Sequence, residues 1–263
     1  MVPLDANAAR HVLAWLGPAA GPGLLALRHA LAYRRPGLWG DDPGAPRSVI
    51  LIRDGDGQLE AFGAGAPEPA VPWLVGRLRG FTLHAPGSWL RPVRDRVGAL
   101  GRAGVETWSG GAAPVKPAVR VGAPRVVTRR LTADDLPAFT AAVPPWGLRG
   151  WRSFPPLIEH GAAFGVPHGP GFAALAWVFD QADGYDALGV STAPRFRRLG
   201  LGRAVAASLV AHVVGRRGKV PLWSTPAADS ASRGLALSLG FSVAATETVV
   251  RWPPRPGPPT HKE

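Results

Sequence analysis

The chain has 263 residues, of which 46% are hydrophobic and 18% are charged, and its formal net charge is +12. This length exceeds the usual size of one domain and the composition is that of a globular protein, so we expect two modest domains and exclude a disordered chain. The positive charge favours anionic ligands in general, whereas the absence of cysteine excludes disulfides, thiolate nucleophiles and cysteine-ligated metal sites.

Helices and strands alternate in the N-terminal half of the sequence. We expect, in chain order, helices at about 6–16 and 22–33, strands at 48–53 and 58–63, a helix at about 69–79, a strand at about 81–84, a helix at 88–103 and a strand at 105–108. The sequence Asp-Gly-Asp-Gly at 54–57 favours the tight turn of a hairpin. These elements predict an N-terminal α/β lobe over residues 1–115.

A linker and a second series of elements follow. Residues 110–124 are rich in Gly, Pro and small side chains and lack apolar periodicity, which is typical of a linker. The expected elements after it are a strand at 125–131, a helix capped by Thr132, an interrupted helix at 146–161, strands at 162–166, 172–180 and 185–192, a helix at 200–215, a strand at 220–225, a helix at 229–239 and a strand at 241–252. We therefore expect a second domain over 125–252 and a disordered tail over 253–263. Both halves share the order strand, glycine turn, strand and helix, which raises the hypothesis of a duplication.

The segment 185–203 carries the strongest chemical signal, because a predicted strand leads there into a glycine-rich loop and then into a helix. Gly200 and Gly202 let the backbone approach a ligand closely, and unpaired N–H groups at a helix start attract anions. Arginines near this helix start have the wrong sign for the helix dipole, and a bound pyrophosphate would offset them. They are Arg197, Arg198 and Arg203. A solvated helix start is the alternative interpretation, and for the loop alone we give the two similar weight.

The loop fits a family signature. Arg197, Gly200 and Gly202 fill the pattern R/Q-x-x-G-x-G/A after a predicted strand, and Pro194 stands three residues before the arginine. In these residues the chain resembles the GNAT superfamily of N-acetyltransferases. The resemblance implies that the loop binds the pyrophosphate of acetyl-CoA.

Flanking segments extend the resemblance. The sequence Asp-Ser-Ala-Ser at 229–232 is similar to the family's N-x-x-S/A element, Leu-Gly-Phe at 239–241 ends a short helix as it does in the family, and 129–139 is similar to the family's first strand and helix. The resemblance covers about residues 125–250. It implies an α/β (α+β) fold with a mixed, mostly antiparallel sheet flanked by helices, and it implies acetyl-CoA as the acyl donor.

The same resemblance implies a set of cofactor-binding residues. The backbone at the end of the strand would pair with pantetheine and direct an N–H at the thioester carbonyl, and the loop amides would hold the pyrophosphate. The implied residues are Val190, Ser191, Thr192, Arg197, Arg198, Leu199, Gly200, Leu201, Gly202, Arg203, Asp229 and Ser232. Two positions depart from the family pattern. Asp229 replaces an asparagine, and Ala236 stands where a tyrosine often protonates the leaving thiolate, so water or Ser232 would have to donate that proton.

Asp186 is the candidate general base. It lies eleven residues before Arg197, where family members that use a carboxylate tend to place one, and direct attack requires a neutral amine. A solvated strand end or a salt-bridge partner is an equally weighted interpretation. Glu159 and His160 are weaker candidates. Because the histidines lack a metal-ligand spacing and no cysteine is present, no metal site is expected.

Three functions stay open. The first is an acetyltransferase that acts directly on a small-molecule or protein amine, and the second is a non-catalytic CoA-binding regulatory module, which Ala236 suggests. The third is a nucleic-acid-associated protein, which no concentrated basic tract or aromatic RNA-binding signature supports. A dinucleotide-binding motif fails at Val205, and the phosphate loop of NTPases is absent.

The N-terminal lobe has no R-x-x-G-x-G loop. We expect it to be a degenerate GNAT-like unit that shapes the acceptor site together with residues 146–160. Since the chain start has no basic segment before an apolar stretch and no apolar run approaches ~18 residues, a soluble cytoplasmic protein without a membrane partner is the default expectation. The sequence predicts neither the acceptor nor the oligomeric state.

Overall fold

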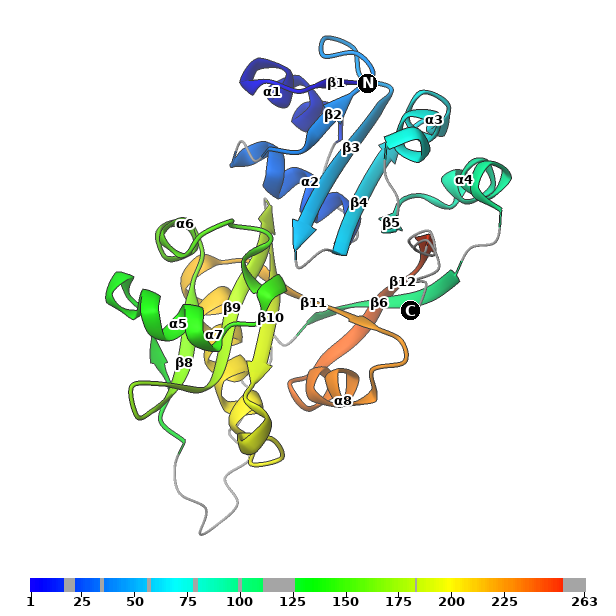
Figure 1. Ribbon diagram of the computed structural model, residues 1–263. Helices are drawn as coiled ribbons and strands as arrows, with labels where there is room; N and C mark the ends of the chain where they lie inside the picture. Colours follow the sequence, from blue (N-terminus) through cyan, green and yellow to red (C-terminus); the bar gives the residue numbers. More distant parts are fainter. Residues whose placement is uncertain are drawn as a thin grey trace, which may run out of the picture. The chain divides into compact units, whose positions relative to one another are not determined.

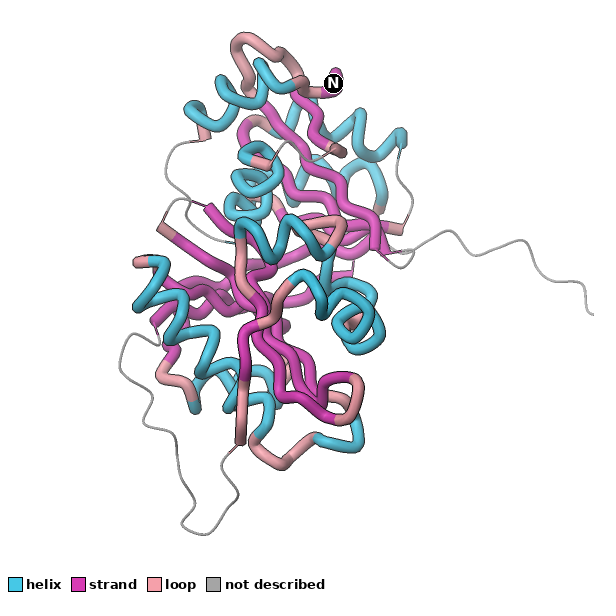
Figure 2. The backbone as a smooth tube through the Cα atoms, turned by 90° about the vertical axis from the view of Figure 1, so that its left-hand side faces the viewer, coloured by secondary structure: helices cyan, strands magenta, loops and turns pink. Residues whose placement is uncertain are grey.

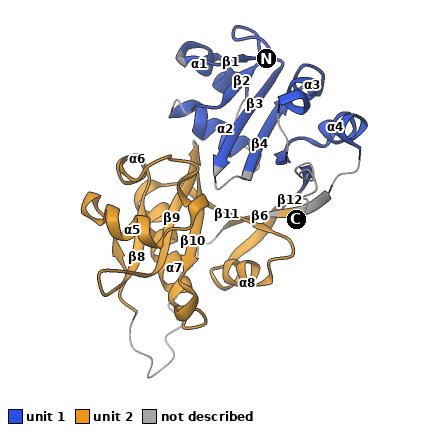
Figure 3. Cartoon of the chain, viewed as in Figure 1, with its two compact units in different colours: residues 1–104, 247–263 blue, residues 105–246 orange. Residues whose placement is uncertain are grey.

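The computed structural model describes residues 1–16, 22–33, 36–55, 58–77, 80–98, 101–110, 126–182 and 184–252. They form two compact units (Figure 3): unit 1 comprises residues 1–104 and 247–263, and unit 2 comprises residues 105–246. These bounds differ from the expected domains 1–115 and 125–252, because a strand before the linker belongs to unit 2 and the end of the last strand belongs to unit 1. The expected tail, and all of the expected linker except residue 110, lie outside the described residues.

Unit 1 contains helices and a sheet (Figure 1). Its elements are β1 (Val2–Pro3), α1 (Ala6–Trp15), α2 (Pro22–Ala32), β2 (Leu38–Gly40), β3 (Ser48–Gly55), β4 (Gln58–Gly65), α3 (Pro67–Arg77), β5 (Phe81–His84), the 3-10 turn η1 (Gly87–Trp89) and α4 (Leu90–Val97). The strands pair in the order β1-β2-β3-β4-β5, and among these described pairs β4–β5 alone is parallel. The end of the last strand of the chain, Val250 to Trp252, pairs antiparallel with β5.

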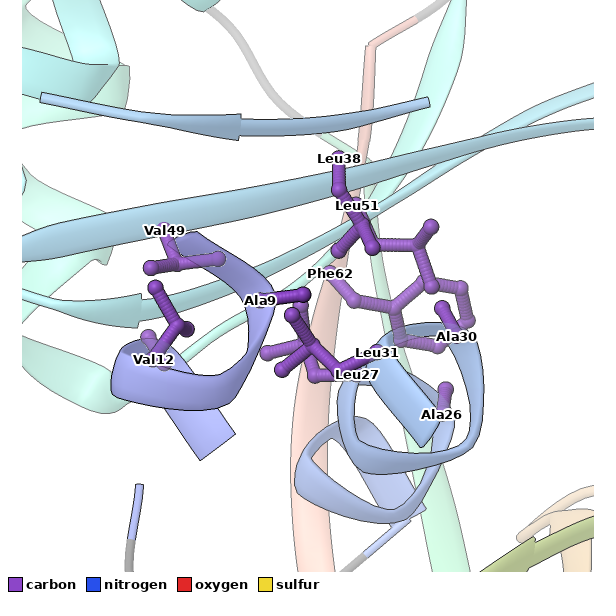
Figure 4. Packing of buried hydrophobic residues seen from close by; sticks show 11 residues of the cluster. Ala9, Val12, Ala26, Leu27, Ala30, Leu31, Leu38, Val49, Leu51 and Phe62 are labelled. Atoms are coloured by element: carbon purple, nitrogen blue, oxygen red, sulfur yellow. The ribbon is translucent and has the colours of Figure 1, made fainter. Parts of the chain in front are cut away.

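Apolar side chains of the unit 1 strands are buried on both faces of the sheet. Neighbouring residues of a strand point to opposite faces, so Leu51 and Ile50 of β3 enter different clusters. Leu51 belongs to a cluster that also contains Val12 of α1 and Leu27 of α2 (Figure 4). Ile50 packs on the other face with α3 residues and with Trp89 of η1. The sequence therefore forms two cores around one sheet.

His84 on β5 is predicted to make the stability of unit 1 depend on pH. Its ring stacks on Phe62 with 4.6 Å between centroids, and burial together with the charge of Arg53 lowers its pKa from 6.5 to about 4. Between these pH values the unfolded chain binds a proton that the folded chain excludes, so the free energy of unfolding falls by roughly 2–3 kcal/mol as the pH falls through this window. Urea unfolding across this range would measure the loss. His84→Phe should flatten the profile, and equal slopes for the two proteins would contradict the prediction.

Unit 2 also contains helices and a sheet (Figure 1). Its elements are β6 (Gly101–Gly110), which enters this unit at Val105, β7 (Arg129–Arg130), η2 (Ala133–Asp135), α5 (Leu136–Ala142), η3 (Pro145–Leu148), α6 (Phe154–His160), β8 (Ala163–His168), β9 (Gly171–Ala182), β10 (Tyr185–Thr192), η4 (Pro194–Phe196), α7 (Leu201–Arg217), β11 (Val220–Pro226), α8 (Ser230–Ser238) and β12 (Phe241–Trp252), which leaves it after Thr246. The strands pair in the order β6-β11-β10-β9-β8-β7, and of these described pairs only β10–β11 is parallel. The expected mixed, mostly antiparallel sheet flanked by helices is confirmed. Figure 2 distinguishes the described helices from the strands.

Two layers cover the unit 2 sheet. Val205, Leu209 and Val213 of α7, spaced four residues apart, are fully buried, so this helix lies on one face of the sheet. Trp177 of β9 is fully buried and contacts Phe139 of α5 edge to face, which marks the opposite face as the side of α5. None of the helices in the described ranges has the length and hydropathy of a membrane span.

The two halves of the chain repeat one order of elements. The series β1, α1, α2, β2, β3, β4, α3, β5 and α4 corresponds to β7, α5, α6, β8, β9, β10, α7, β11 and α8. In each series the strand before the long helix pairs in parallel with the strand after it. The strand that follows each series pairs with a strand of the other series. The strand β6, which follows the first series, pairs with β11, and the strand β12, which follows the second, pairs with β5. The two halves thus share one order of elements, and the GNAT-like nature of the N-terminal unit stays a prediction.

Several element bounds differ from the predictions. The helix expected at 88–103 ends at Val97, because Gly98 has a φ of 75°, and residues 101–110 form a strand instead. The interrupted helix at 146–161 becomes η3 and α6, and Arg152 between them has a φ of 63°. The short strands β1 and β2 were not predicted, since two or three residues carry little periodicity.

Candidate functional site

The strands β10 and β11 separate after a short parallel contact. Their pairing covers Tyr185–Ala187 and Val220–Leu222, although β10 continues to Thr192 and β11 to Pro226. Beyond the contact β10 stays paired with β9, and β11 stays paired with β6. Figure 1 shows the two strands diverging. The edge of β10 at 188–192 that faces β11 therefore has no strand partner within the described residues.

A bulge coincides with this separation. Ala187 pairs with Asp180 of β9, but the next residue, Leu188, pairs with Val178, so Phe179 is an extra residue on β9. A bulge increases the local twist of the strands that contain it. It thus helps to turn the end of β10 away from β11.

The loop between β10 and α7 leaves its backbone N–H groups available. The first helical hydrogen bond of α7 joins the Ala204 N–H to the Gly200 carbonyl at 3.0 Å, and within the described part of the chain no protein acceptor takes the N–H groups of 198–203. Gly200 has a φ of 78° and Arg198 a φ of 66°. A left-handed conformation costs a residue with a side chain about 1 kcal/mol or more, so Arg198 holds a costly backbone conformation in this loop. Such a helix start binds anions.

Gly200 and Gly202 are required for different structural reasons. Gly200 is needed for its positive φ, since a Cβ there would meet no atom within 4 Å. A Cβ on Gly202 would lie 2.8 Å from the Thr192 hydroxyl oxygen. The absence of a side chain at Gly202 thus lets the start of α7 approach the end of β10.

Two of the predicted arginines hold the site together. Arg197 donates from Nε to the Thr192 carbonyl at 3.2 Å. Arg203 donates to the Ser238 carbonyl at 3.2 and 3.3 Å and so joins α7 to the end of α8. Their guanidinium groups still bring positive charge to the loop. Arg198 and Leu199 are exposed.

The residues from α8 form the other side of the predicted set. Asp229 caps α8 by accepting the Ser232 N–H at 2.9 Å, and the Ser232 hydroxyl accepts from the indole N–H of Trp223 on β11 at 3.0 Å. Asp229 and Ser232 therefore fix the start of α8 over β11. Ala236 is fully buried and brings no hydroxyl. The half-buried residues Val190, Ser191 and Thr192 lie on the diverging edge.

Asp186 lies away from the loop, at the start of β10. Its carboxylate is fully buried and forms ion pairs with Arg217 and, at 3.0 Å, with Lys219. Arg217, the last residue of α7, also donates to Gln181 and to the carbonyls of residues 160 and 161. Thr192 lies six residues further along the strand than Asp186, at a distance of about 20 Å. A carboxylate that two cations already hold inside the protein is poorly suited to take a proton from a substrate, so this geometry favours the salt-bridge interpretation.

The weaker base candidates are exposed at the end of α6. Glu159 and His160 approach each other at 3.7 Å between Oε2 and Nε2. Within the described residues, no cluster of three or more metal-ligating side chains occurs.

Sequence reasoning missed an aromatic surface on the face of β10 opposite α7. A Cβ on Gly189 would lie 2.6 Å from the ring of Trp177, so that ring rests on the β10 backbone. Trp146 of η3 lies against Trp177 and Phe179, with ring centroids 5.5 and 5.9 Å apart, and is 38% exposed. The pairing of Trp177 with Gly189 could be found only from the strand register.

Comparisons with known proteins agree with this geometry. Residues 163–250 match the family model described as FR47-like protein, while no curated protein matches the chain. Among solved structures, a GCN5-related N-acetyltransferase-like protein from Streptococcus suis is similar at a TM-score of 0.69 and 17% identity, over 94% of this chain and 99% of that one. A tandem GNAT protein from the clavulanic acid biosynthesis pathway is similar at 0.61 and 14%, over 97% and 99%. An acetyltransferase from the GNAT family of Colwellia psychrerythraea is similar at 0.58 and 16%, over 95% and 98%.

The C-terminal segment therefore matches the FR47-like family model, and the chain has the fold of solved GNAT-type proteins. The recognition made from the R-x-x-G-x-G loop is confirmed, and the family match begins at residue 163 where the expectation began at 125. At these identities the structural likeness concerns the fold alone. The fold class predicted from the sequence is confirmed.

Proposed function

We propose that the protein is an acetyl-CoA-dependent N-acetyltransferase. The observation that most supports this function is the convergence of two features in unit 2. The diverging strands β10 and β11 expose a backbone edge at 188–192, and the loop that follows β10 presents unpaired N–H groups at 198–203. A long anionic cofactor with an amide-bearing arm is complementary to both.

The predicted cofactor residues have separate tasks in this proposal. The N–H groups of 198–203 would bind the pyrophosphate, and the charges of Arg197, Arg198 and Arg203 would favour it. The backbone of 190–192 would align the pantetheine arm. A backbone N–H on this edge would stabilise negative charge on the thioester oxygen when an amine attacks. Asp229 and Ser232 would hold α8 beside the arm.

The reaction requires proton transfers that few side chains can perform here. The amine nitrogen bonds to the thioester carbon and loses a proton, the carbon–sulfur bond breaks, and the leaving thiolate takes a proton. The Ser232 hydroxyl accepts from Trp223 and keeps its own proton for donation. Because Asp186 is held by two cations, we infer that the amine arrives neutral and that water takes the proton that its nitrogen loses as the amide forms.

The acceptor amine is proposed to approach from the face of β10 opposite α7. On that face Gly189 leaves room for the Trp177 ring, and Trp146 adds an exposed aromatic surface. Aromatic faces attract cationic and apolar groups. This supports the expectation that residues 146–160 contribute to the acceptor site.

Gly202→Glu is expected to weaken acetyl-CoA binding at least roughly 100-fold, or by about 2.7 kcal/mol. The new side chain would meet Thr192 and would bring negative charge to the anion site. Isothermal titration with acetyl-CoA measures the change. Gly215→Glu is the matched control, because Gly215 belongs to the same helix and a Cβ there meets no atom within 4 Å. Equal affinity of the two folded variants would contradict the proposed site.

A non-catalytic CoA-binding module is the second candidate, and the buried Ala236 favours it. The two functions differ in turnover. Thiol release from acetyl-CoA in the presence of a panel of amines supports the enzyme, whereas binding without thiol release for any amine supports the module.

A further inference from the structure

The repeated order of elements gives unit 1 a counterpart of the site in unit 2. The strands β4 and β10 both have eight residues, and each is followed by a helix and a parallel strand. Aligned end to end, Gly63 and Gly65 of β4 correspond to Val190 and Thr192 of β10. Residues at these positions also face the same side of their sheets. Val190 and Thr192 face α7, and Gly63 faces the cluster that contains residues of α3.

A tryptophan of unit 1 covers this counterpart. The last parallel pair of β4 and β5 is Phe62 with His84, and Trp89 follows five residues later. A Cβ on Gly63 would lie 2.6 to 3.0 Å from three atoms of the Trp89 ring, and the indole N–H donates to the Gly65 carbonyl at 2.8 Å. Trp89 is fully buried. Its ring thus occupies the end of β4, where the corresponding part of β10 is left open.

The helix start in unit 1 also differs from that of α7. The chain passes from β4 to α3 through a single residue, Ala66, whose N–H donates to the Arg47 carbonyl at 2.7 Å. Pro67 and Pro69 have no N–H to offer, and Glu68 brings negative charge to the first turn. This helix start therefore repels a phosphate where α7 attracts one.

We propose that Trp89 is a built-in occupant of the unit 1 counterpart, and that each chain takes one acyl-CoA, in unit 2. The proposal rests on the function proposed above for unit 2. It assigns the N-terminal repeat a closed site, in which an indole ring and its N–H replace the contacts that a ligand would make with the strand end.

Ligand counting tests this proposal. Native mass spectrometry with CoA is expected to find one ligand for each wild-type chain and none for Gly202→Glu. Hydrogen exchange with CoA present is expected to show protection of residues 188–203. Two ligands for each wild-type chain, or protection of residues 58–68, would overturn the closed site in unit 1. No binding by folded wild-type protein would instead contradict the function proposed for unit 2, and with it the count of one.

Indole tests the occupant without any use of CoA. Trp89→Ala is expected to lower the melting temperature by roughly 6–20 °C, and millimolar indole is expected to restore part of this loss while leaving the wild type unchanged. If Trp89→Ala does not fold, Trp89→Leu provides the same comparison. A variant that melts at the temperature of the wild type, or whose melting temperature indole does not raise, would contradict the proposal that Trp89 occupies the unit 1 counterpart.

Discussion

A chain that begins at residue 125 is expected to be insoluble or unfolded, although it retains every element from β7 to β12. It lacks β6, whose residues Val105 to Ser109 pair with β11. Trp108 of β6 is 3% exposed and lies opposite Trp223 of β11, so the truncation exposes a buried aromatic pair and an unpaired strand edge, which promotes aggregation. The end of β12 also loses its partner β5. Circular dichroism and gel filtration would measure the outcome.

A chain that begins at residue 101 is the matched comparison for this truncation. It also lacks the first hundred residues, but it keeps β6 and therefore the complete pairing of β11. If the pairing of β6 with β11 is what unit 2 needs in order to fold, we expect this chain to be folded and to bind CoA. Cooperative unfolding of the shorter chain, or identical behaviour of the two chains, would contradict that role of β6.

Local patterns in the sequence predicted most elements of both units. The strands at 185–192 and 241–252 have the predicted bounds, since each is a run of residues that favour β structure and is followed by turn residues. Which strands pair is a non-local property. The linker at 110–124 placed the expected boundary after β6, yet β6 pairs with β11 more than a hundred residues later. No periodicity within a segment contains that information.

The candidate site was predictable where it depends on backbone chemistry. Gly200 and Gly202 were recognised from their spacing, and the structure adds a positive φ for one and a close strand contact for the other. The side-chain partners were not predictable. Arg203 reaches Ser238, 35 residues away, and Asp186 meets cations 31 and 33 residues away. A carboxylate on a strand gives no sign in the sequence of whether it faces a substrate or an arginine.

Asp186→Asn is expected to destabilise the protein by roughly 3 kcal/mol and to lower the melting temperature by roughly 6–12 °C. The substitution leaves Arg217 and Lys219 without their shared carboxylate, and Arg217 joins the end of α7 to β9, β10 and the end of α6. Both cations are partly exposed, which keeps the cost at the lower end of the range for buried pairs. Thermal unfolding followed by circular dichroism measures it.

The same variant separates the structural role of Asp186 from the catalytic one. A general base typically contributes 10²- to 10⁴-fold to the rate, so a catalytic Asp186 predicts that thiol release falls by about that factor while stability changes little. The ion-pair role predicts the reverse: a lower melting temperature, acetyl-CoA affinity within about twofold of wild type, and a largely retained rate below the transition. Asp134→Asn, at an exposed position in η2, is the control and should change stability by less than about 0.5 kcal/mol. An unchanged melting temperature together with a loss of thiol release would instead support Asp186 as the general base.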